Sequence, residues 1–391
     1  MSKILLAFDS FKNCMSAVDA CKAAEEGIAR LGLKEIGTEL VPLSDGGEGI
    51  IDVLQKSPDF KDAECFEADA HDAYFNPVKV SVLQKNSLAV IESARVCGLE
   101  RAQKSGLRFM DGSSYGVGEV IKVCLSRGIE KILISLGGSA TNDGGAGMAQ
   151  ALGVEFLKAD GSVLNTPVTV KDLPLIAAAD FSKIDPRVKK CSFEVPCDVV
   201  NPLLGAAGAT YVYGKQKGAS HEDLAIAEHG MTCYCKAMER ATRLTEVKDL
   251  PGAGAAGGLG AGCLYTLKAK LRSGIDTVLE LTAFDVRLAE AALVITGEGR
   301  SDAQSAQGKV PSGVIRHCRE HNVKCVVISG ALGDGSPDLI RLGASGIFSI
   351  CDRPMTLETS LRDAKELLAI QCANVTRLIS LCGGLNTKTP L

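Results

Sequence analysis

The stretch LGGSATNDGGAGM, from Leu136 to Met148, follows the apolar run KILIS and decides how this sequence folds. The Ile- and Leu-rich run predicts a buried strand, and Gly137 with Gly138 allows the backbone to turn sharply after it. A second pair of glycines then precedes the helix-like sequence AGMAQALG. A strand, a glycine turn and a helix start, in this order, are typical of an α/β fold.

Short polar side chains occupy this turn. Ser139, Thr141 and Asn142 supply hydroxyl and amide groups, and Asp143 adds a carboxylate. Backbone amides beside a helix N-terminus attract anions, so the stretch predicts a site for a phosphate or a carboxylate. The alternative is that the glycines only connect strand to helix and that the polar side chains only cap the helix. Three more stretches of this kind along the chain favour the binding site.

The composition is that of an ordinary soluble globular protein, with 46% hydrophobic and 23% charged residues. The 391 residues are enough for two domains. Lys and Arg total 43 against 47 Asp and Glu, so a net charge of −4 offers no basic surface to nucleic acid. The absence of Trp and the 4% aromatic content also argue against base stacking. We therefore expect a small soluble ligand.

The cysteine pattern and the hydropathy indicate a compartment. Fifteen cysteines occur without any C-x-x-C spacing, as expected for reduced thiols in a cytosolic protein. The N-terminal apolar run is too short for a signal peptide, and no apolar run approaches the roughly twenty residues that cross a bilayer. We expect a cytoplasmic protein without a membrane partner. The oligomeric state stays open, and a homo-oligomer is compatible with the sequence.

Two predicted strand ends near the N-terminus carry polar groups. The run KILLAF predicts a strand, and Asp9, Ser10 and Lys12 follow it. The run TELVPL predicts a second strand, which leads into SDGGEG with Asp45. The carboxyl ends of parallel strands are where open α/β sheets bind ligands. These residues are therefore candidates for the site.

The middle of the chain adds another strand end. Residues 57–85 have an alternating pattern that predicts antiparallel strands or a connection between lobes. Farther on, a strand is predicted from Phe193 to Cys197, and Asp198 follows it beside the Asn201-Pro202 turn. Asp198 is a candidate catalytic carboxylate. A role that is limited to capping the turn is the alternative.

The stretch LPGAGAAGGLGAGC, from Leu250 to Cys263, contains a literal G-x-G-x-x-G. It is a poor dinucleotide fingerprint, because the preceding TEVKDLP does not predict a buried strand. We expect instead a glycine-rich turn that lets the backbone approach a nucleotide or a substrate.

Three buried-strand signals follow toward the C-terminus, in ALVITGEGR, CVVISGALGDG and GIFSI. The first ends close to Arg300, and Lys309 comes soon after it. Like the first fifty residues, this block has apolar strand runs that end in glycine and charged residues. The two ends of the chain are therefore expected to share one sheet. We predict a discontinuous α/β domain of residues 1–85 plus 287–391 and an inserted α/β domain of residues 86–286.

Eight stretches, in order, make the chain resemble the bacterial glycerate kinase family, the type I glycerate kinases, over most of its length. They are FDSFK, PLSDGGEG, SYGVGE, LGGSATNDGGAGM, CDVVNPLLG, QKG, PGAGAAGGLGAG and TGEGRSDAQSAQGKVPSG. The resemblance implies that ATP phosphorylates D-glycerate at the 2-hydroxyl, giving 2-phosphoglycerate, with Mg²⁺ as the metal. It also implies a flavodoxin-like domain, a second α/β domain, and a site in the cleft between the two.

Two departures from the family pattern are visible. Phe8 stands where the family commonly has Pro, and Asn13 stands where it commonly has Gly. Glycine often occupies positions with unusual backbone angles, so the geometry around Lys12 is expected to depend on the backbone angles of Asn13.

Phosphoryl transfer requires mainly positioning and charge around the triphosphate. We expect Asp198 to accept the proton of the attacking hydroxyl. Asp9 and Asp45 are expected to hold the metal, because Mg²⁺ prefers a few carboxylate oxygens together with phosphate and water.

Cations and backbone amides complete the expected site. Lys12, Arg300 and Lys309 would neutralise phosphate or hold the glycerate carboxylate, with Lys12 and Arg300 acting in catalysis. The other residues expected to bind substrate or phosphate are Ser10, Gly137, Gly138, Ser139, Thr141, Asn142, Gly254, Gly257 and Gly258.

The sequence is also compatible with other functions. Phosphorylation at the 3-hydroxyl is one, and a dehydrogenase that uses the GAGAAG turn for a dinucleotide is another. A non-catalytic ligand sensor is the third, and the number of charged candidates argues against it, because pure binding rarely needs so many charges in one site.

Overall fold

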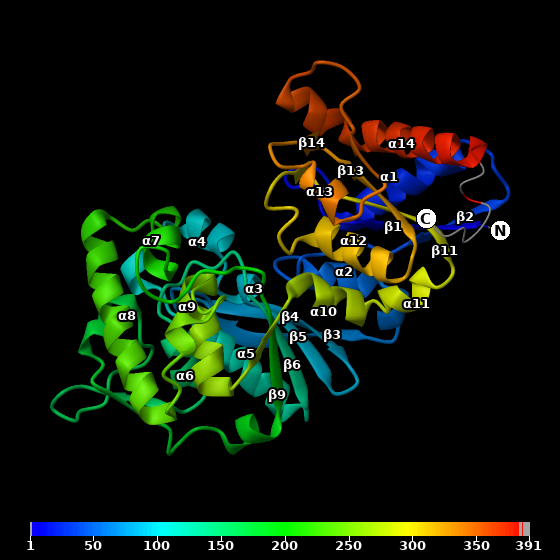
Figure 1. Ribbon diagram of the computed structural model, residues 1–391. Helices are drawn as coiled ribbons and strands as arrows, with labels where there is room; N and C mark the ends of the chain where they lie inside the picture. The colour runs from blue at the N-terminus through cyan, green and yellow to red at the C-terminus, as the bar shows by residue number, and fades with distance from the viewer. Residues whose placement is uncertain (1, 383–384, 386–391) are drawn as a thin grey trace. The chain divides into compact units, whose positions relative to one another are not determined.

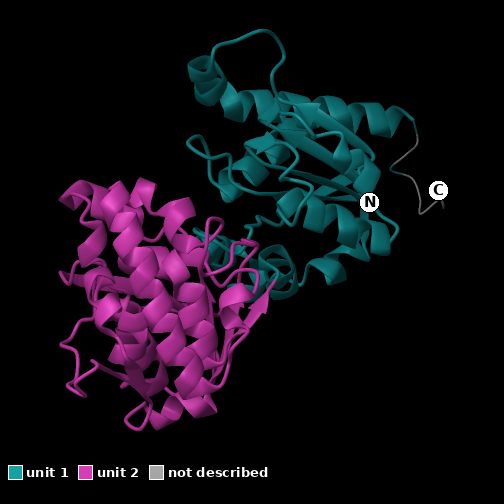
Figure 2. Cartoon of the chain, turned by 60° about the vertical axis from the view of Figure 1, so that its left-hand side comes forward, with its two compact units in different colours: residues 1–61, 273–391 teal, residues 62–272 magenta. Residues whose placement is uncertain are grey.

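The computed structural model describes residues 2–382 and 385. The chain forms two compact units, coloured separately in Figure 2. Unit 1 consists of Met1–Lys61 together with Ser273–Leu391, and unit 2 consists of Asp62–Arg272. Each unit is built on its own sheet.

The sheet of unit 1 has five parallel strands in the order β15-β13-β11-β1-β2. Their bounds are β1 Ser2–Phe8, β2 Ile36–Leu40, β11 Ala291–Gly297, β13 Lys324–Ser329 and β15 Gly346–Ser349. Numbered along the chain within this unit, the strand order is 2-1-3-4-5, which is the flavodoxin-like order. Both ends of the chain therefore contribute to one flavodoxin-like sheet, as the sequence predicted.

Helices cover both faces of this sheet (Figure 1). α1, Ala17–Ala29, packs against α14, Leu357–Leu381, and the apolar side chains of Ile4 and Leu6 lie in the same core. The two helices approach closely at Gly27, where a Cβ atom would lie 2.0 Å from the carbonyl oxygen of Ala369. Ser16 caps α1 by accepting a hydrogen bond from the Asp19 amide, as its N-cap spacing predicted.

The other helices and short strands of unit 1 connect these elements. α12 packs against β11 and β13. The bounds are α2 Ile50–Lys56, α10 Gly274–Leu281, α11 Phe284–Leu288, β12 Arg300–Ser301, α12 Val310–Glu320, β14 Ala331–Leu332 and α13 Asp338–Leu342.

The sheet of unit 2 has six strands in the order β10-β9-β6-β5-β4-β3. Their bounds are β3 Glu64–His71, β4 Pro77–Lys85, β5 Leu88–Glu92, β6 Lys131–Ser135, β9 Ser192–Pro196 and β10 Lys270–Arg272. β3, β4 and β5 are antiparallel neighbours, whereas β5, β6, β9 and β10 are parallel. The antiparallel strands expected within residues 57–85 are therefore present.

The units change over at residues 61/62 and 272/273, not at the expected 85/86 and 286/287. The first difference arises because β4 pairs with β5, which ties residues 64–85 to the sheet of unit 2. The second arises because α10 and α11 pack within unit 1. The alternation of apolar and polar residues in these strands indicates that one face of each strand is buried. It does not indicate which of the two sheets the strands join.

The remaining elements of unit 2 lie around its sheet. The longest is α8, His221–Thr242, which begins with a capping box between Ser220 and Asp223. The others are α3 Ser93–Cys97, α4 Leu99–Ser105, α5 Tyr115–Ser126, α6 Ala146–Ala151, β7 Glu155–Leu157, β8 Ala178–Asp180, α7 Ala209–Tyr213 and α9 Ala255–Gly262.

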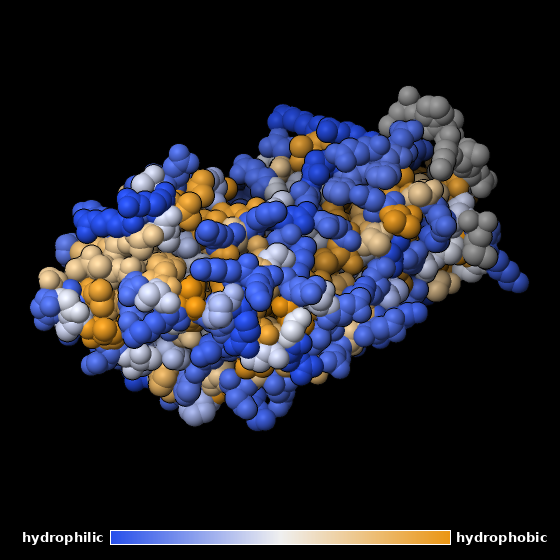
Figure 3. Space-filling model, turned by 90° about the horizontal axis from the view of Figure 1, so that it is seen from below, coloured by the Kyte–Doolittle hydropathy of each residue, from blue (hydrophilic) through white to orange (hydrophobic). Residues whose placement is uncertain are grey.

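Hydrophilic residues are interspersed with smaller apolar areas on the face drawn in Figure 3. Among the described helices, none combines the length and the apolar character needed to cross a bilayer.

Candidate active site

The carboxyl ends of β1 and β11 lie side by side, because the two strands pair in parallel with Phe8 opposite Gly297. The Asp9 amide donates a hydrogen bond to the Gly297 carbonyl at 3.0 Å, so Asp9 and Glu298 emerge at the same edge of the sheet. β1 and β11 are also the strands at which the strand order reverses. In open α/β sheets this is the position of the ligand-binding crevice.

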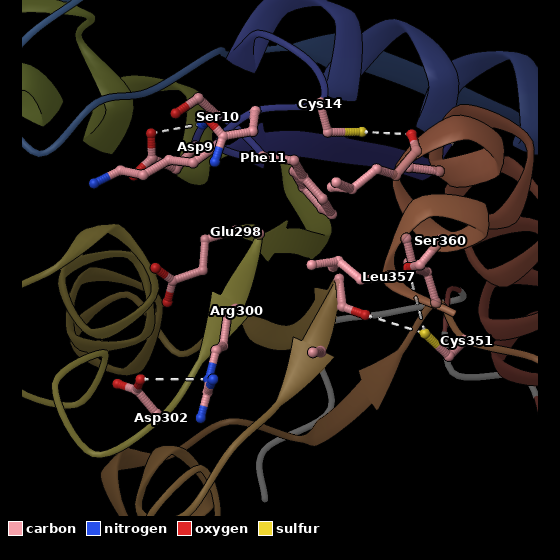
Figure 4. Close-up of a pocket in the computed structure, with 18 of the residues that line it drawn as sticks. Asp9, Ser10, Phe11, Cys14, Glu298, Arg300, Asp302, Cys351, Leu357 and Ser360 are labelled. Atoms are coloured by element: carbon pink, nitrogen blue, oxygen red, sulfur yellow. Dashed lines mark hydrogen bonds and ion pairs between the residues drawn. The ribbon is translucent and has the colours of Figure 1, made fainter. Parts of the chain in front are cut away.

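A cavity of about 580 Å³ opens at this edge within unit 1 (Figure 4). Six of the predicted site residues line it: Asp9, Ser10, Lys12, Asp45, Arg300 and Lys309. Glu298 and Asp302, which were not among the predicted site residues, also line it. Glu298 follows a predicted strand in the same way as Asp9 follows β1, and that signal was available in the sequence.

The cavity has two chemically different parts. Figure 4 shows Asp9, Glu298 and Arg300 on one side, and Phe11 and Leu357 on the other. The apolar part also includes Ile350, Met355, Leu361 and Ala364. These residues come from the segment between β15 and the first turns of α14. The site therefore offers charges and an apolar wall to one ligand.

The carboxylates of this cavity repel one another. Burial raises the pKa of Asp9 to about 7, and the charges of Asp45 and Glu298 add to the rise. A hydrogen bond of 2.6 Å from the Ser10 amide to Asp9 Oδ1 opposes it. Burial also raises the pKa of Glu298, against hydrogen bonds from Ser305 and Ser301 and the charge of Lys309. A cation placed here would relieve this repulsion.

The donor set fits a magnesium ion that is completed by a phosphorylated ligand. Mg²⁺ in phosphoryl-transfer sites is commonly held by one or two carboxylates, with phosphate oxygens and water filling the other positions. Asp45 is held in place by the Gly47 amide, which donates to its Oδ1 at 3.0 Å. Within the described residues, no three His, Cys, Asp or Glu side chains form a ready-made metal site. Asp9 and Asp45 could therefore hold the metal only together with other ligands.

Two cations of the cavity lie on different kinds of backbone: Lys12 on a tight turn, and Arg300 at the start of the short strand β12. Lys12 lies in the turn in which the Phe11 amide bonds to the Met15 carbonyl at 2.9 Å. Asn13, in this turn, has a φ of 62°, so this position does require the left-handed backbone that the family's glycine would provide. Arg300 Nε lies 3.7 Å from Asp302 Oδ2, and its side chain is largely exposed. Both cations can thus reach a ligand.

The loop after β6 in unit 2 differs from the expected anion site. Asp143 itself occupies the start of α6, accepting hydrogen bonds from the amides of Gly145 and Gly147 at 3.3 and 3.0 Å. The Ser114 amide and hydroxyl each donate to Asp143 Oδ2 at 2.8 Å. Asp143, and not Ser139, Thr141 or Asn142, therefore accepts the hydrogen bonds of the amides at this helix start. The sequence could not reveal it, because Ser114 lies 29 residues away along the chain.

A buried lysine that was not among the predicted site residues, Lys217, contacts the same loop. Lys217 Nζ donates to Ser139 Oγ at 3.2 Å and to the Thr141 carbonyl at 2.6 Å. Only 2% of this residue is exposed, and burial lowers its pKa to about 8, against the charges of Cys97 and Asp143. The basic turn YGKQKG was visible in the sequence, but nothing there distinguished the buried Lys217 from the exposed Lys215.

The glycine-rich turn that leads into α9 and continues through its non-helical residues 256–258 packs directly against this loop. The Gly144 amide donates to the Gly257 carbonyl at 3.1 Å, and a Cβ on Gly257 would lie 1.9 Å from the Thr141 carbonyl oxygen. On its other side, the Gly254 amide donates to the Asn201 carbonyl at 3.0 Å. The sequence predicted an approach of this turn to a nucleotide or a substrate, and the close approaches described here are made to two protein loops.

These contacts gather three predicted segments into one cluster at the carboxyl edge of β6 and β9. They are the loop of residues 136–145, the loop of residues 197–208, which contains Asp198, and the turn of residues 250–258. Asn142 Nδ2 donates to Thr210 Oγ1 at 3.1 Å, while its buried Oδ1 has no hydrogen-bond partner within the described structure. The element before the turn is a 3₁₀ helix, Val247–Asp249, and not the strand that a dinucleotide fingerprint requires.

The predicted residues therefore form two groups. One lines the cavity of unit 1, and the other, with Asp198, lies in the loop cluster of unit 2. The sequence profile of the Glycerate kinase family matches residues 4–380. The chain belongs to the glycerate kinase family. It is therefore a kinase, an enzyme that transfers a phosphoryl group.

Individual relatives in the glycerate kinase family match over nearly their whole length. A glycerate kinase of Halalkalibacterium halodurans is 38% identical, over 96% of this chain and 97% of the relative. A glycerate 2-kinase of Escherichia coli is 34% identical, over 97% and 98%. The crystal structure of a putative glycerate kinase 2 from Salmonella typhimurium superposes with a TM-score of 0.84 at 34% identity, covering 98% of this chain and 99% of that one.

Proposed function

We propose that this kinase transfers the γ-phosphoryl group of ATP to the 2-hydroxyl of D-glycerate, giving ADP and 2-phosphoglycerate. Family membership supports the reaction class, and the name of the Escherichia coli relative, a glycerate 2-kinase, supports the position of transfer. The observation that carries the proposal is the two-part cavity of unit 1, with its charges beside an apolar wall.

This cavity is assigned to ATP. A volume of about 580 Å³ suits a nucleotide, whereas a three-carbon acid would fill only a small part of it. Lys12, Arg300 and Lys309 would neutralise the phosphates, and the hydroxyl of Ser10 would add a hydrogen bond. The apolar wall around Phe11 would hold the base.

Asp9 and Asp45 would hold Mg²⁺ in this cavity, with the neighbouring charge of Glu298 contributing to its attraction. When bound, the ion would offset negative charge on the phosphate oxygens. The raised pKa of Asp9 supports this assignment, because clustered buried carboxylates without a cation are costly.

The loop cluster of unit 2 is assigned to D-glycerate. Asp198 would accept the proton of the 2-hydroxyl while that oxygen attacks the γ-phosphorus and the bond from this phosphorus to the oxygen of ADP breaks. The backbone around Gly137 and Gly138, the side chains of Ser139, Thr141 and Asn142, and the turn with Gly254, Gly257 and Gly258 would hold the acid. The buried, unpartnered Oδ1 of Asn142 supports a polar guest here.

Phosphorus NMR of the product made from ATP and D-glycerate tests the proposal. We expect the resonance of 2-phosphoglycerate together with that of ADP. The resonance of 3-phosphoglycerate would move the transfer to the other hydroxyl, and the absence of any new phosphate monoester would reject the reaction.

A further inference from the structure

A second cavity, also of about 580 Å³, lies in unit 2 and contains none of the residues assigned above to phosphoryl transfer. Its walls come from the start of β9, from the end of α8 and from Cys263–Leu267, a π-helix that continues α9. Figure 1 shows these elements in the inserted part of the chain. π-helical turns are rare and often occur at functional sites.

The inner wall of this cavity is apolar and partly aromatic. It includes the buried side chains of Val188, Phe193 and Leu267, with Phe181 and Ile184 beside them. Small-molecule sites commonly have this volume and a mainly hydrophobic and aromatic lining. The wall therefore suits a ligand with an apolar body.

The rim of the cavity carries an excess of positive charge. Lys189, Lys268 and Lys270 line it and are exposed to solvent. Among its lining residues the acid is Glu194, whose two oxygens lie 3.0 Å from Lys131 Nζ and 3.2 Å from Arg272 Nη1. Because Glu194 is already neutralised, the lysines of the rim favour an anionic group on the ligand.

The wall also contains a hydroxyl group whose hydrogen-bonding capacity is unused. Thr266 is 5% exposed, and within the described structure its Oγ1 is buried without a hydrogen-bond partner. In contrast, Thr242 Oγ1 in the same lining donates to the Met238 carbonyl at 2.7 Å. A buried hydroxyl without a hydrogen-bond partner is unfavourable, and a polar atom of a ligand could supply that partner.

We propose that this cavity is a further ligand site, which binds an organic anion with an aromatic or branched apolar body. The apolar wall holds the body, Lys268 and Lys270 attract the anionic head, and Thr266 offers a polar contact. The site is independent of the proposed nucleotide cavity, which is built from other residues of the other unit.

The full-length enzyme is titrated with 8-anilinonaphthalene-1-sulfonate, an aromatic anion whose fluorescence rises in an apolar site. N-phenyl-1-naphthylamine, which has the same aromatic body without the sulfonate, is the uncharged comparison. We expect the double variant Lys268→Glu with Lys270→Glu to weaken the affinity for the sulfonate at least about tenfold and to change that for the amine less than about twofold. Lys236→Glu, at an exposed position of α8, is the matched control and should change neither.

A second variant tests the position of the probe. Ala241→Trp, at an exposed helix position that lines the cavity, should abolish the binding of both probes and leave the melting temperature unchanged. Saturating ATP with Mg²⁺ should not displace the sulfonate. The proposal is overturned if the sulfonate does not bind, if ATP displaces it, or if its affinity survives both the charge reversal and Ala241→Trp.

Discussion

The ammonium group of Lys217 lies 2.6 Å from the backbone carbonyl oxygen of Thr141, in the interior of unit 2. Its second hydrogen bond, to Ser139 Oγ, ties the turn that carries Lys217 to the loop after β6. A charge that is buried in this way is costly, so its protonation should be coupled to the stability of the fold.

Raising the pH should stabilise the wild type relative to Lys217→Met. The pKa of Lys217 in the folded protein is about 8, below its ordinary value of 10.5, so below pH 8 the unfolded chain binds a proton more tightly than the folded chain. The resulting loss of stability is full below about pH 8, and it decreases between pH 8 and pH 10.5 as the unfolded chain also gives up its proton. We expect the difference in the free energy of unfolding to shift by about 2 kcal/mol between pH 7 and pH 10, measured by urea denaturation.

Lys215→Met, at an exposed position of the same turn, is the matched control. Its unfolding free energy should follow the wild type at both pH values. Equal pH dependence of the wild type and Lys217→Met would show that the Lys217 pKa is not depressed.

Asp9→Asn should stabilise the metal-free protein and still remove activity. Above pH 7 the ionised Asp9 is buried near the charges of Asp45 and Glu298, and asparagine removes this repulsion while it keeps an acceptor for the Ser10 amide. We expect an increase of at least about 1 kcal/mol in the free energy of unfolding at pH 8. Turnover should fall at least about 100-fold.

Asp334→Asn, which removes an exposed carboxylate outside the cavity lining, should change neither quantity. If Asp9→Asn destabilised the protein, or kept full turnover, the role given to Asp9 would be refuted.

Asp198→Asn tests the general base. Asparagine has nearly the same shape but cannot accept the hydroxyl proton, so kcat should fall about 100-fold to 10,000-fold while the KM for D-glycerate changes little. A coupled assay of ADP release measures both constants. Normal turnover at saturating ATP and D-glycerate would remove Asp198 from this role.

Gly257→Ala should strongly destabilise unit 2. The position has a φ of 70°, and the added Cβ would lie 1.9 Å from the Thr141 carbonyl oxygen, where two backbone segments meet. We expect a loss of at least about 3 kcal/mol in the free energy of unfolding. Gly161→Ala is the control that distinguishes the steric clash of an added Cβ from the strain of a positive φ. Gly161 has a φ of 83°, but no atom lies within 4 Å of its added Cβ. It should cost only about 1 kcal/mol, and an equal loss in both variants would contradict the role of close packing.

The cavity of unit 1 was largely predictable from the sequence. Asp9, Asp45 and Arg300 follow apolar strand signals, and parallel strands bring such residues to one edge. Its apolar wall was not predictable, because the segment that carries Met355 and Leu357 joins the cavity only through the position of β15 in the sheet.

The loop cluster of unit 2 was predictable only in part. The strand and turn around Gly137 were correctly placed, yet the partners of Asp143 and the burial of Lys217 depend on long-range packing. A carboxylate beside glycines has the same local sequence whether it caps a helix or lines a ligand site. The local sequence pattern therefore predicted where these loops lie, but it did not predict which of their residues cap a helix and which could bind a ligand.

Photolabelling with 8-azido-ATP, followed by peptide mapping, tests most directly the assignment of ATP to the cavity of unit 1. We expect the label within residues 350–364, on the apolar wall of that cavity, and its suppression by excess ATP. Label confined to residues 136–145 or 250–258 would place the nucleotide in the loop cluster of unit 2 and contradict the assignment.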